Sequence, residues 1–217
     1  MLPEVNLGMA EFGEKFNVSR ETLSRINTYR ELLILWNARI NLVSASTITD
    51  FWSRHAADCA QILDVAGENI HSVIDMGSGA GLPGLIIAAL LKDKSRMQQI
   101  TLVEAQSKKC AFLREASRTL DVKINIENKK IEDLSPAKYD LVTARAFAPL
   151  TKLLDLSLAY SQLGARILFL KGEDVSKEIN EASTKWKFCY KTTQSITHKH
   201  GCVLEISDLM RLDSGEK

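Results

Sequence analysis

The sequence predicts an α/β fold built on a mostly parallel sheet, and two observations indicate it. Short apolar strand-like segments at 73–76, 100–104 and 139–145 alternate with helical segments, as expected when crossover helices join parallel strands. A turn containing Gly77, Gly79 and Gly81 follows the first of these strands and leads into an apolar helical segment. This order predicts a ligand site at the carboxyl end of the sheet.

Length and composition indicate one soluble domain with an extension. The 217 residues are 45% hydrophobic and 25% charged, which is ordinary for a globular protein. With 28 Lys and Arg against 27 Asp and Glu, there is no overall basic field, so any nucleic-acid site must be a local patch. We therefore expect local rather than global charge to guide binding.

The sequence also predicts the compartment. The four cysteines are dispersed without a C-x-x-C pair, which favours reduced thiols over a disulfide frame or a zinc site. No segment resembles a signal peptide, and none approaches the ~20 apolar residues of a membrane span. We expect a cytoplasmic protein, monomeric, with no membrane partner and no metal.

Residues 1–70 are predicted to form a helical extension or cap, and residues 71–217 the main domain. Ser19 is a suitable N-cap for a helix in which Leu23 and Ile26 begin an apolar stripe. Farther along, two tryptophans occur close to a group of titratable residues. We interpret these titratable residues as surface or paired charges of the cap, with the mouth of a pocket as the alternative; they are Arg39, Arg54, His55 and Asp58.

The glycine turn offers bare backbone to a ligand, because its glycines lack a Cβ and accept positive φ. A glycine turn alone also fits a dinucleotide fold, since Gly79-x-Gly81-x-x-Gly84 satisfies that fingerprint. Asp75 separates the two hypotheses, because a carboxylate pointing into the turn would repel a pyrophosphate. It would favour a ligand with an ammonium and a sulfonium group, such as S-adenosylmethionine. Pro83 suits the start of the next helix.

The second predicted strand, 100–104, ends in Glu104. A carboxylate at this position can accept both hydroxyls of a ribose, and both hypotheses use it in this way. Beyond an alternating strand at 122–126, the short segment 130–133 is expected to pass the base of the cofactor, where Glu132 could accept from an adenine amino group.

The remaining elements complete the sheet. A helix at 107–120 carries basic residues that we interpret as a solvated face rather than an RNA patch. Arg145 stands at the exit of the strand 139–145, at the edge where ligands bind, and Pro149 opens the next helix. A strand at 165–170 and an antiparallel pair at 186–193 and 202–206 follow. His198 and His200 lie between the last two, and a histidine pair without other ligands is no metal site.

Methyl transfer from a sulfonium is an in-line displacement, so positioning dominates and few side chains are obligatory. The strand exit at 143–146 lacks the acid-or-Asn, Pro-Pro, aromatic run that clamps an exocyclic amine. No Pro-Cys or Thr-Cys pair supplies a thiolate for attack on a pyrimidine. What remains is an acceptor that is already nucleophilic, and purine N7 qualifies because it has a free lone pair and no proton to lose.

Several motifs together resemble the bacterial methyltransferase G family of small-subunit ribosomal RNA, also called glucose-inhibited division protein B. They run from Trp36 to Gly172 and read W-N-x-x-x-N-L-V-S, F-W-x-R-H-x-x-D, D-M-G-S-G-A-G-L-P-G, L-V-E-x-x-x-K-K-x-x-F-L, Y-D-x-V-T-x-R-A-x-A-P-L and L-x-L-K-G. Met76 and Ser78 replace a usual valine and threonine. The segment around His200 matches poorly.

The resemblance implies a Rossmann-like class I S-adenosylmethionine-dependent methyltransferase fold with a seven-stranded sheet. It also implies transfer of a methyl group to N7 of a guanine in 16S ribosomal RNA of the small subunit. Carried over by motif, the cofactor contacts would be Gly77, Gly79, Leu82, Glu104, Ile131, Glu132 and Arg145. His55, Asp58 and Lys171 match family positions near an RNA mouth, without an assigned role, and no catalytic residue is predicted.

Two other hypotheses remain at this point. An NAD-dependent oxidoreductase would share the glycines and Glu104, but the sequence lacks an evident Tyr-x-x-x-Lys or His–acid pair. A non-catalytic RNA-binding or ribosome-assembly factor could keep the cofactor pocket without transferring a methyl group.

Overall fold

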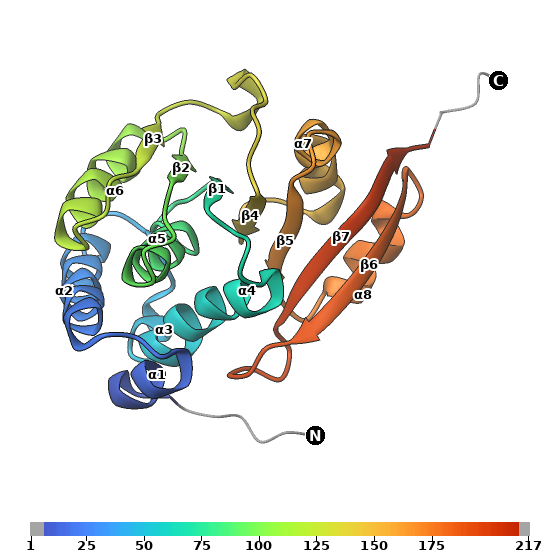
Figure 1. The fold of residues 1–217 in the computed structure, drawn as a ribbon. Helices are drawn as coiled ribbons and strands as arrows, with labels where there is room; N and C mark the ends of the chain where they lie inside the picture. Colours follow the sequence, from blue (N-terminus) through green and yellow to red (C-terminus); the bar gives the residue numbers. More distant parts are fainter. Residues whose placement is uncertain (1–6, 213–217) are drawn as a thin grey trace.

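The structure is a computed structural model that describes residues 7–212, and it contains a single seven-stranded sheet (Figure 1). The strand order is β3-β2-β1-β4-β5-β7-β6. The first five strands are parallel, and β7 runs antiparallel to both of its neighbours. The strands are β1 (Ser72–Met76), β2 (Gln99–Val103), β3 (Asn125–Glu127), β4 (Leu141–Arg145), β5 (Arg166–Lys171), β6 (Trp186–Gln194) and β7 (Cys202–Arg211).

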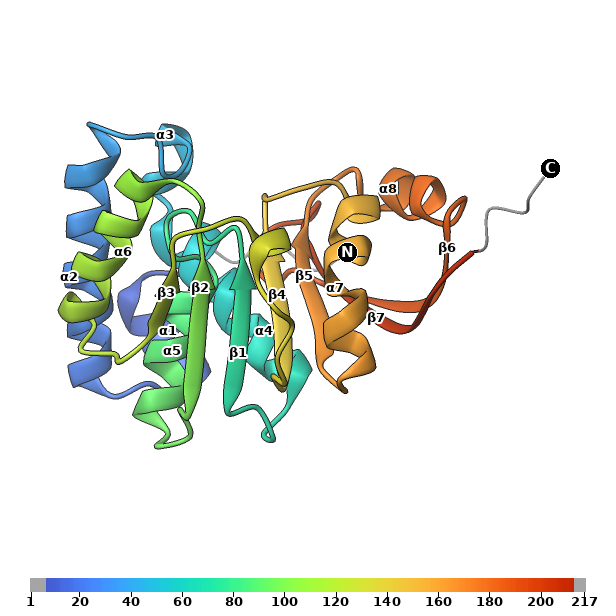
Figure 2. The same ribbon diagram turned by 90° about the horizontal axis from the view of Figure 1, so that it is seen from above.

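Helices cover both faces of the sheet (Figure 2). The helices α4, α5 and α6 pack on one face with α1 and α2 outside them, and α7 and α8 cover the other. The helices are α1 (Met9–Phe16), α2 (Arg20–Asn37), α3 (Ala45–Ile48), the π-helix η1 (Trp52–Ala57), α4 (Asp58–Ala66), α5 (Gly84–Asp93), α6 (Ser107–Thr119), the 3₁₀ turn η2 (Ile131–Asp133), α7 (Leu150–Gln162) and α8 (Val175–Ala182).

The protein has two hydrophobic cores, one on each face of the sheet. They arise because successive side chains along a strand point to opposite faces. In β1, Val73 belongs to the core beneath α4, α5 and α6, whereas Ile74 and Met76 belong to the core beneath α7 and α8. Every residue of α5 from Gly84 to Leu91 is buried, which confirms the predicted apolar helical segment after the turn. The sheet is therefore held from both sides, and its carboxyl edge is a rigid platform.

The amino-terminal helices share the first core with the sheet. Ser19 caps α2, because its hydroxyl oxygen accepts the Thr22 N–H. Tyr29 of α2 is fully buried, and its hydroxyl donates to the carbonyl of Ala80 in the glycine turn at 2.7 Å. The extension thus supports the turn directly. The division at residue 70 stays a prediction.

Most predicted elements are present, with some differences at their ends. Helix α5 begins at Gly84, so Pro83 precedes its first residue. Strand β7 extends to Arg211, and helix α8 was not predicted. On α6 the buried residues are Cys110, Phe112, Leu113 and Ala116.

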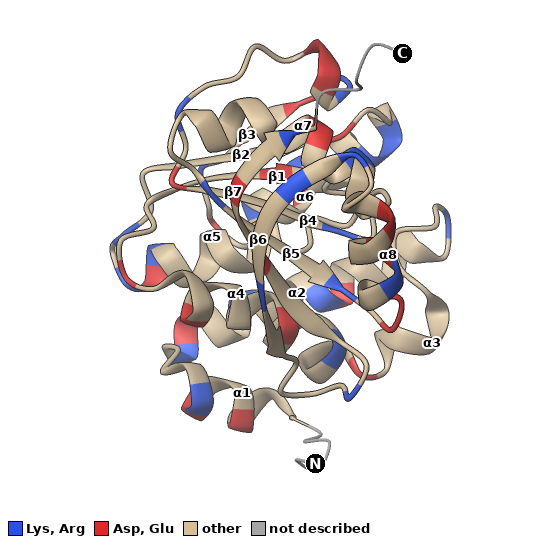
Figure 3. Cartoon of the chain, turned by 90° about the vertical axis from the view of Figure 1, so that its right-hand side faces the viewer, with Lys and Arg blue, Asp and Glu red and all other residues tan. Residues whose placement is uncertain are grey.

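Charge is evenly distributed on the side of the molecule shown in Figure 3, where acidic and basic residues are interspersed. This matches the near-balance of Lys and Arg with Asp and Glu in the sequence. Within residues 7–212, no helix has the length and apolar character needed to cross a membrane.

Candidate functional site

A crevice opens at the carboxyl ends of β1, β2 and β4, the edge at which open parallel sheets bind ligands. It consists of two adjoining hollows of about 620 and 510 Å³. Gly77, Lys109 and Ala146 border both hollows, so the two form one sheet-edge crevice. Each hollow falls within the roughly 300–1,000 Å³ typical of small-molecule sites.

The glycines of the turn have different roles. Gly77, Gly79 and Gly81 all have positive φ, at 68°, 53° and 80°. A Cβ on Gly81 would overlap Leu85 and Leu113, so that glycine permits close packing inside the protein. A Cβ on Gly79 would meet nothing closer than the Gly77 carbonyl oxygen at 3.8 Å. Only Gly79 therefore presents an open backbone face to the crevice.

At Gly77 the open side is already covered by an aromatic ring. A Cβ there would overlap the ring of Phe147, which follows β4 and is 39% exposed. Leu82 is buried and borders the crevice on the side of the turn.

Glu104, directly after β2, is buried yet borders the crevice. Its Oε2 accepts the Gly79 N–H at 3.0 Å, and its Oε1 accepts the Gln106 N–H at 2.8 Å. A carboxylate has about four lone-pair sites, so both oxygens keep acceptor capacity. Glu104 thus fixes the turn and offers a positioned acceptor to the crevice.

Asp75 does not point into the crevice, contrary to the sequence-based interpretation. Its side chain is fully buried beneath the turn, and Oδ2 accepts the Gly84 N–H at 3.2 Å at the start of α5. Burial raises the pKa of this carboxyl to about 7. Helix α5 supplies the donor that draws the side chain inward, so its charge does not face a ligand directly.

The segment after β3 borders the far end of the crevice. Ile131 is buried in the second core, and both Ile131 and Glu132 line the hollow that contains Glu104. The Glu132 carboxylate forms an ion pair with Lys152 at 2.8 Å, so it already has a partner. Lys109, which the sequence placed on a solvated face, is half-buried and lines both hollows.

Arg145 at the end of β4 lies against a buried histidine. Its Nη2 is 2.5 Å from Nδ1 of His55, and its Nη1 contacts Sγ of Cys59 at 3.8 Å. Because an arginine can only donate, Nδ1 of His55 accepts, and its Nε2 carries the proton near Thr47 Oγ1 at 3.0 Å. Burial and the neighbouring Arg145 lower the pKa of His55 to about 3, which keeps it neutral.

His55 is therefore not the surface or paired charge of the first interpretation; it lines the glycine side of the crevice, in agreement with the alternative of a pocket mouth. It is 2% exposed and holds Arg145 at the border of the crevice. Asp58 accepts hydrogen bonds from the hydroxyls of Ser195 and Thr197 at 2.7 and 2.8 Å, so its partners are neutral donors rather than a cation. The F-W-x-R-H-x-x-D motif was the only signal in the sequence for the buried His55.

The loop between β4 and α7 borders the crevice and has an unusual backbone. Ala146 has φ of 50°, a conformation that costs a non-glycine residue energy and often marks a functional segment. Lys171 Nζ donates to the Ala148 carbonyl at 3.3 Å and to Glu178 at 2.6 Å. Glu178 in turn accepts the Leu150 N–H at 2.6 Å. We call Lys171 and Glu178 the loop brace.

The histidine pair lies in the β6–β7 connection, where Nδ1 of His200 is 4.0 Å from Oε1 of Glu173. The rings of His198 and His200 are 5.6 Å apart. In residues 7–212, three or more His, Cys, Asp or Glu side chains nowhere gather closely enough to hold a metal ion.

The strand order, the glycine turn and the acid after β2 define a class I S-adenosylmethionine-dependent methyltransferase fold. Solved structures share it at low sequence identity. A ribosomal protein L11 methylase from Lactobacillus delbrueckii subsp. bulgaricus superposes with a TM-score of 0.53 at 16% identity, covering 69% of this chain and 76% of its own. The magnesium protoporphyrin IX methyltransferase of Synechocystis PCC 6803, solved with S-adenosylmethionine, superposes with a TM-score of 0.52 at 14% identity. The match covers 87% of this chain and 97% of that methyltransferase.

The chain belongs to the GidB family, rRNA small subunit methyltransferase G, whose profile matches residues 22–206. Curated relatives with that description extend over nearly the whole chain. One from Paramagnetospirillum magneticum is 39% identical over 205 residues, covering 94% of this chain and 98% of its own length. Another from Caulobacter vibrioides is 38% identical over 212 residues, covering 98% and 97%.

Proposed function

We propose that this protein transfers the methyl group of S-adenosylmethionine to N7 of a guanine in 16S ribosomal RNA of the small subunit. The observation that carries the proposal is the open backbone of Gly79 beside the positioned carboxylate of Glu104, in a chain of the GidB family. The family assignment also favours methyl transfer over the nicotinamide-dependent alternative.

The residues of the crevice suit this cofactor. The bare backbone of Gly79 would accept the methionine part, with Gly77 beside it under the ring of Phe147 and Leu82 packed against it. Glu104 would accept the ribose hydroxyls, because its oxygens keep free lone pairs. Ile131 would pack against the adenine side. Glu132 is paired with Lys152, so its side chain would have to leave that partner before it could accept from the adenine amino group.

The chemistry requires little from the protein beyond positioning. The bound cofactor supplies an electrophilic methyl group on a sulfonium. The N7 lone pair of guanine forms the new N–C bond while the C–S bond breaks and its electrons remain on sulfur. No proton leaves N7, so no general base is needed, which agrees with a neutral His55 held by Arg145 rather than aimed at a substrate.

Arg145 would act at the border between cofactor and RNA. Its guanidinium lines the glycine side of the crevice and also the cavity on the other side of the β4–α7 loop. The purine becomes cationic on methylation, so the site gains from nearby carboxylates and aromatic faces rather than from additional cations. His55 holds Arg145 at this border through one nitrogen of the guanidinium.

Transfer of tritium from labelled S-adenosylmethionine to small subunits tests the proposal. The subunits should come from cells that lack this protein, so that the target guanine is unmodified. We expect label in 16S RNA, whereas a non-catalytic assembly factor would leave the subunits unlabelled. A parallel fluorescence titration with NADH should show no saturable binding; tight NADH binding without labelling would favour the oxidoreductase.

The assembled small subunit is the substrate that the charge balance favours. A protein with almost equal numbers of acidic and basic residues has no long basic groove for naked RNA. We propose that the protein acts as a cytoplasmic monomer, and sedimentation of the purified protein checks that state.

A further inference from the structure

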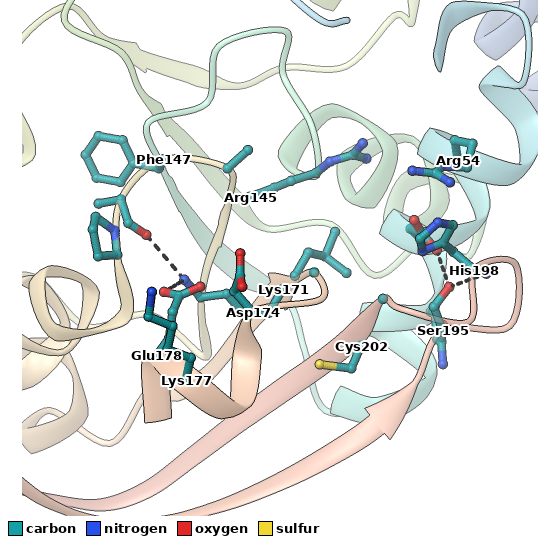
Figure 4. A pocket seen from close by; sticks show the side chains of 18 of the residues that line it. Arg54, Arg145, Phe147, Lys171, Asp174, Lys177, Glu178, Ser195, His198 and Cys202 are labelled. Carbon is teal, nitrogen blue, oxygen red and sulfur yellow. Dashed lines mark hydrogen bonds and ion pairs between the residues drawn. The ribbon is translucent and has the colours of Figure 1, made fainter. Parts of the chain in front are cut away.

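A second cavity lies beside the sheet-edge crevice, on the other side of the β4–α7 loop (Figure 4). Its volume is about 650 Å³. Arg145 and Ala146 border this cavity and the glycine side of the crevice, and Phe147 borders it and the side that contains Glu104. The cavity and the crevice therefore adjoin along these three residues, so a molecule in the cavity would lie next to a ligand in the crevice.

The cavity has walls of opposite charge. Arg54, from η1, lines one side together with Arg145. Asp174 and Glu178, at the start of α8, line the opposite side, and we call them the acidic wall. In Figure 4 the Asp174 carboxylate points into the space between the two sides, toward Arg145.

Several of these charged groups have unused hydrogen-bonding capacity. Within residues 7–212, the structure shows no hydrogen bond or ion pair at the Arg54 guanidinium or at the Asp174 carboxylate. Glu178 uses Oε2 for both Leu150 N–H and Lys171 Nζ, which leaves Oε1 available in a carboxylate that the loop brace holds in place. Arg54 is half-buried, and a half-buried charge without a partner loses hydration without compensation.

We propose that this cavity holds the target guanine nucleotide after it turns out of its RNA stack. The inference rests on the proposed function, which requires an acceptor base next to the crevice. Arg54 binds the phosphate of the nucleotide, a contact for which a guanidinium is well suited. The acidic wall accepts the N1–H and the 2-amino protons of guanine.

The acidic wall selects guanine because of what each base presents on its Watson–Crick edge. Guanine has adjacent donors at N1 and at its 2-amino group, which match carboxylate acceptors. Adenine has a lone pair at N1, which a carboxylate repels. Extruded bases are commonly read in this way, by hydrogen bonds to that edge. Binding this edge also leaves N7, on the five-membered ring, directed away from the carboxylates and free to receive a methyl group.

Binding of mononucleotides to the intact protein tests the assignment without any methyl transfer. Ligand-observed NMR suits weak binding, and excess S-adenosylhomocysteine fills the crevice so that only the second cavity is probed. We expect wild-type protein to bind guanosine monophosphate more tightly than adenosine monophosphate, and more tightly than guanosine. Unchanged affinity for S-adenosylhomocysteine shows that each variant is folded.

Three variants test the acidic wall and Arg54 independently. Asp174→Asn should reduce the preference for guanosine monophosphate over adenosine monophosphate. Asp174→Asn combined with Glu178→Gln should abolish it. The ratio of the two dissociation constants should fall by about tenfold, the discrimination expected of one bidentate contact. Arg54→Gln should remove the preference for guanosine monophosphate over guanosine and keep the preference for guanine. Glu173→Gln is the matched control, because the Glu173 carboxylate borders a different hollow. This variant should change neither the preference for guanine nor the preference for the monophosphate over the nucleoside.

A guanine preference that survives in the double variant, or wild-type protein that binds the two monophosphates equally, overturns the assignment. The proposed function is judged separately by labelling of small subunits with wild-type protein. If labelling occurs but the variants leave the guanine preference intact, only the cavity assignment fails. If the variants behave as expected but no labelling occurs, the proposed function fails.

Discussion

Arg145 and His55, 90 positions apart in the chain, meet at 2.5 Å between Nη2 and Nδ1. The contact joins the end of β4 to the π-helix η1 and determines the proton position on the imidazole. It also ensures that His55 remains neutral, because burial and the adjacent guanidinium both disfavour a second proton. The pair therefore connects the amino-terminal helices with the proposed site.

The neutral His55 should make the fold sensitive to acid. The pKa of His55 falls from 6.5 to about 3 on folding. The contribution of the neutral imidazole to the free energy of unfolding is therefore complete above pH 6.5 and is lost as the pH falls toward 3. At pH 4 the loss amounts to ~3 kcal/mol, at 1.36 kcal/mol for each pH unit below the unfolded pKa. Urea unfolding of His55→Gln should show a weaker pH dependence than wild type between pH 7 and 4, and His200→Gln should match wild type. Parallel curves for His55→Gln and wild type would contradict the buried neutral state.

Arg145→Ala should weaken methyl transfer while the protein stays folded. Arg145 borders both spaces of the proposed site, and lysine cannot reproduce its contacts to His55 and Cys59 at once. We expect Arg145→Lys and Arg145→Ala each to lower turnover by about tenfold or more, corresponding to ~1.4 kcal/mol or more. Arg118→Lys on the exposed side of α6 is the control. Unchanged turnover and cofactor affinity in Arg145→Ala would remove the residue from the site.

Two glycines of the same turn should respond differently to alanine. Gly81→Ala places a Cβ against Leu85 and Leu113 at a positive φ, so it should destabilise the fold by ~3 kcal/mol from overpacking and strain. Gly79→Ala meets only the Gly77 carbonyl oxygen, at an ordinary contact distance of 3.8 Å, and should cost only ~1 kcal/mol for the positive φ, yet it should weaken cofactor binding strongly. Thermal unfolding and calorimetric titration measure both quantities. Equal cofactor affinity for Gly79→Ala and wild type would show that the ligand does not approach this backbone.

Glu104→Ala should raise the dissociation constant for S-adenosylmethionine by about tenfold to a hundredfold, since each hydrogen bond to a charged acceptor contributes ~1.5–3 kcal/mol. The variant also frees the Gly79 and Gln106 N–H groups, so its stability must be measured in parallel. Glu104→Gln keeps the shape and part of the acceptor capacity of the side chain. Its dissociation constant should fall between those of wild type and Glu104→Ala. Isothermal titration that gives the same constant for all three proteins would contradict the ribose assignment.

The loop brace should affect turnover more than cofactor binding. Lys171→Met removes the donor to Ala148 and the partner of Glu178, so the loop that carries Ala146 loses support on the side away from the crevice. We expect turnover on small subunits to fall by about tenfold, ~1.4 kcal/mol, with little change in the dissociation constant of the cofactor. Lys185→Met, exposed after α8, should behave as wild type. A fall in cofactor affinity as large as the fall in turnover would contradict a positioning role.

The parallel sheet and its glycine turn were predictable because their signals are local. Consecutive apolar residues in β1 and α5 specify buried elements, and a glycine turn between them leaves few alternatives. Helix α8 was missed because its eight residues contain only a short apolar stripe between charged residues. Its role as a wall of the second cavity depends on packing that no local pattern records.

Side-chain directions at the site were less predictable. The sequence places Asp75 at the turn, but the free N–H of Gly84 at the start of α5 decides that the carboxylate points inward. Likewise, the burial of His55 depends on a partner on β4 that is distant in the chain. Glu104 differs because its position at the end of a strand already fixes the edge of the sheet that it occupies.

Mass mapping of 16S RNA tests the central claim most directly. Small subunits from cells that lack this protein are incubated with the purified protein and S-adenosylmethionine, and their RNA is digested and analysed by mass spectrometry. We predict one added methyl group, located on N7 of a single guanine, which is absent when the cofactor is omitted. An RNA that gains no methyl group, or gains one on an exocyclic amine, a ribose or a pyrimidine, would contradict the account.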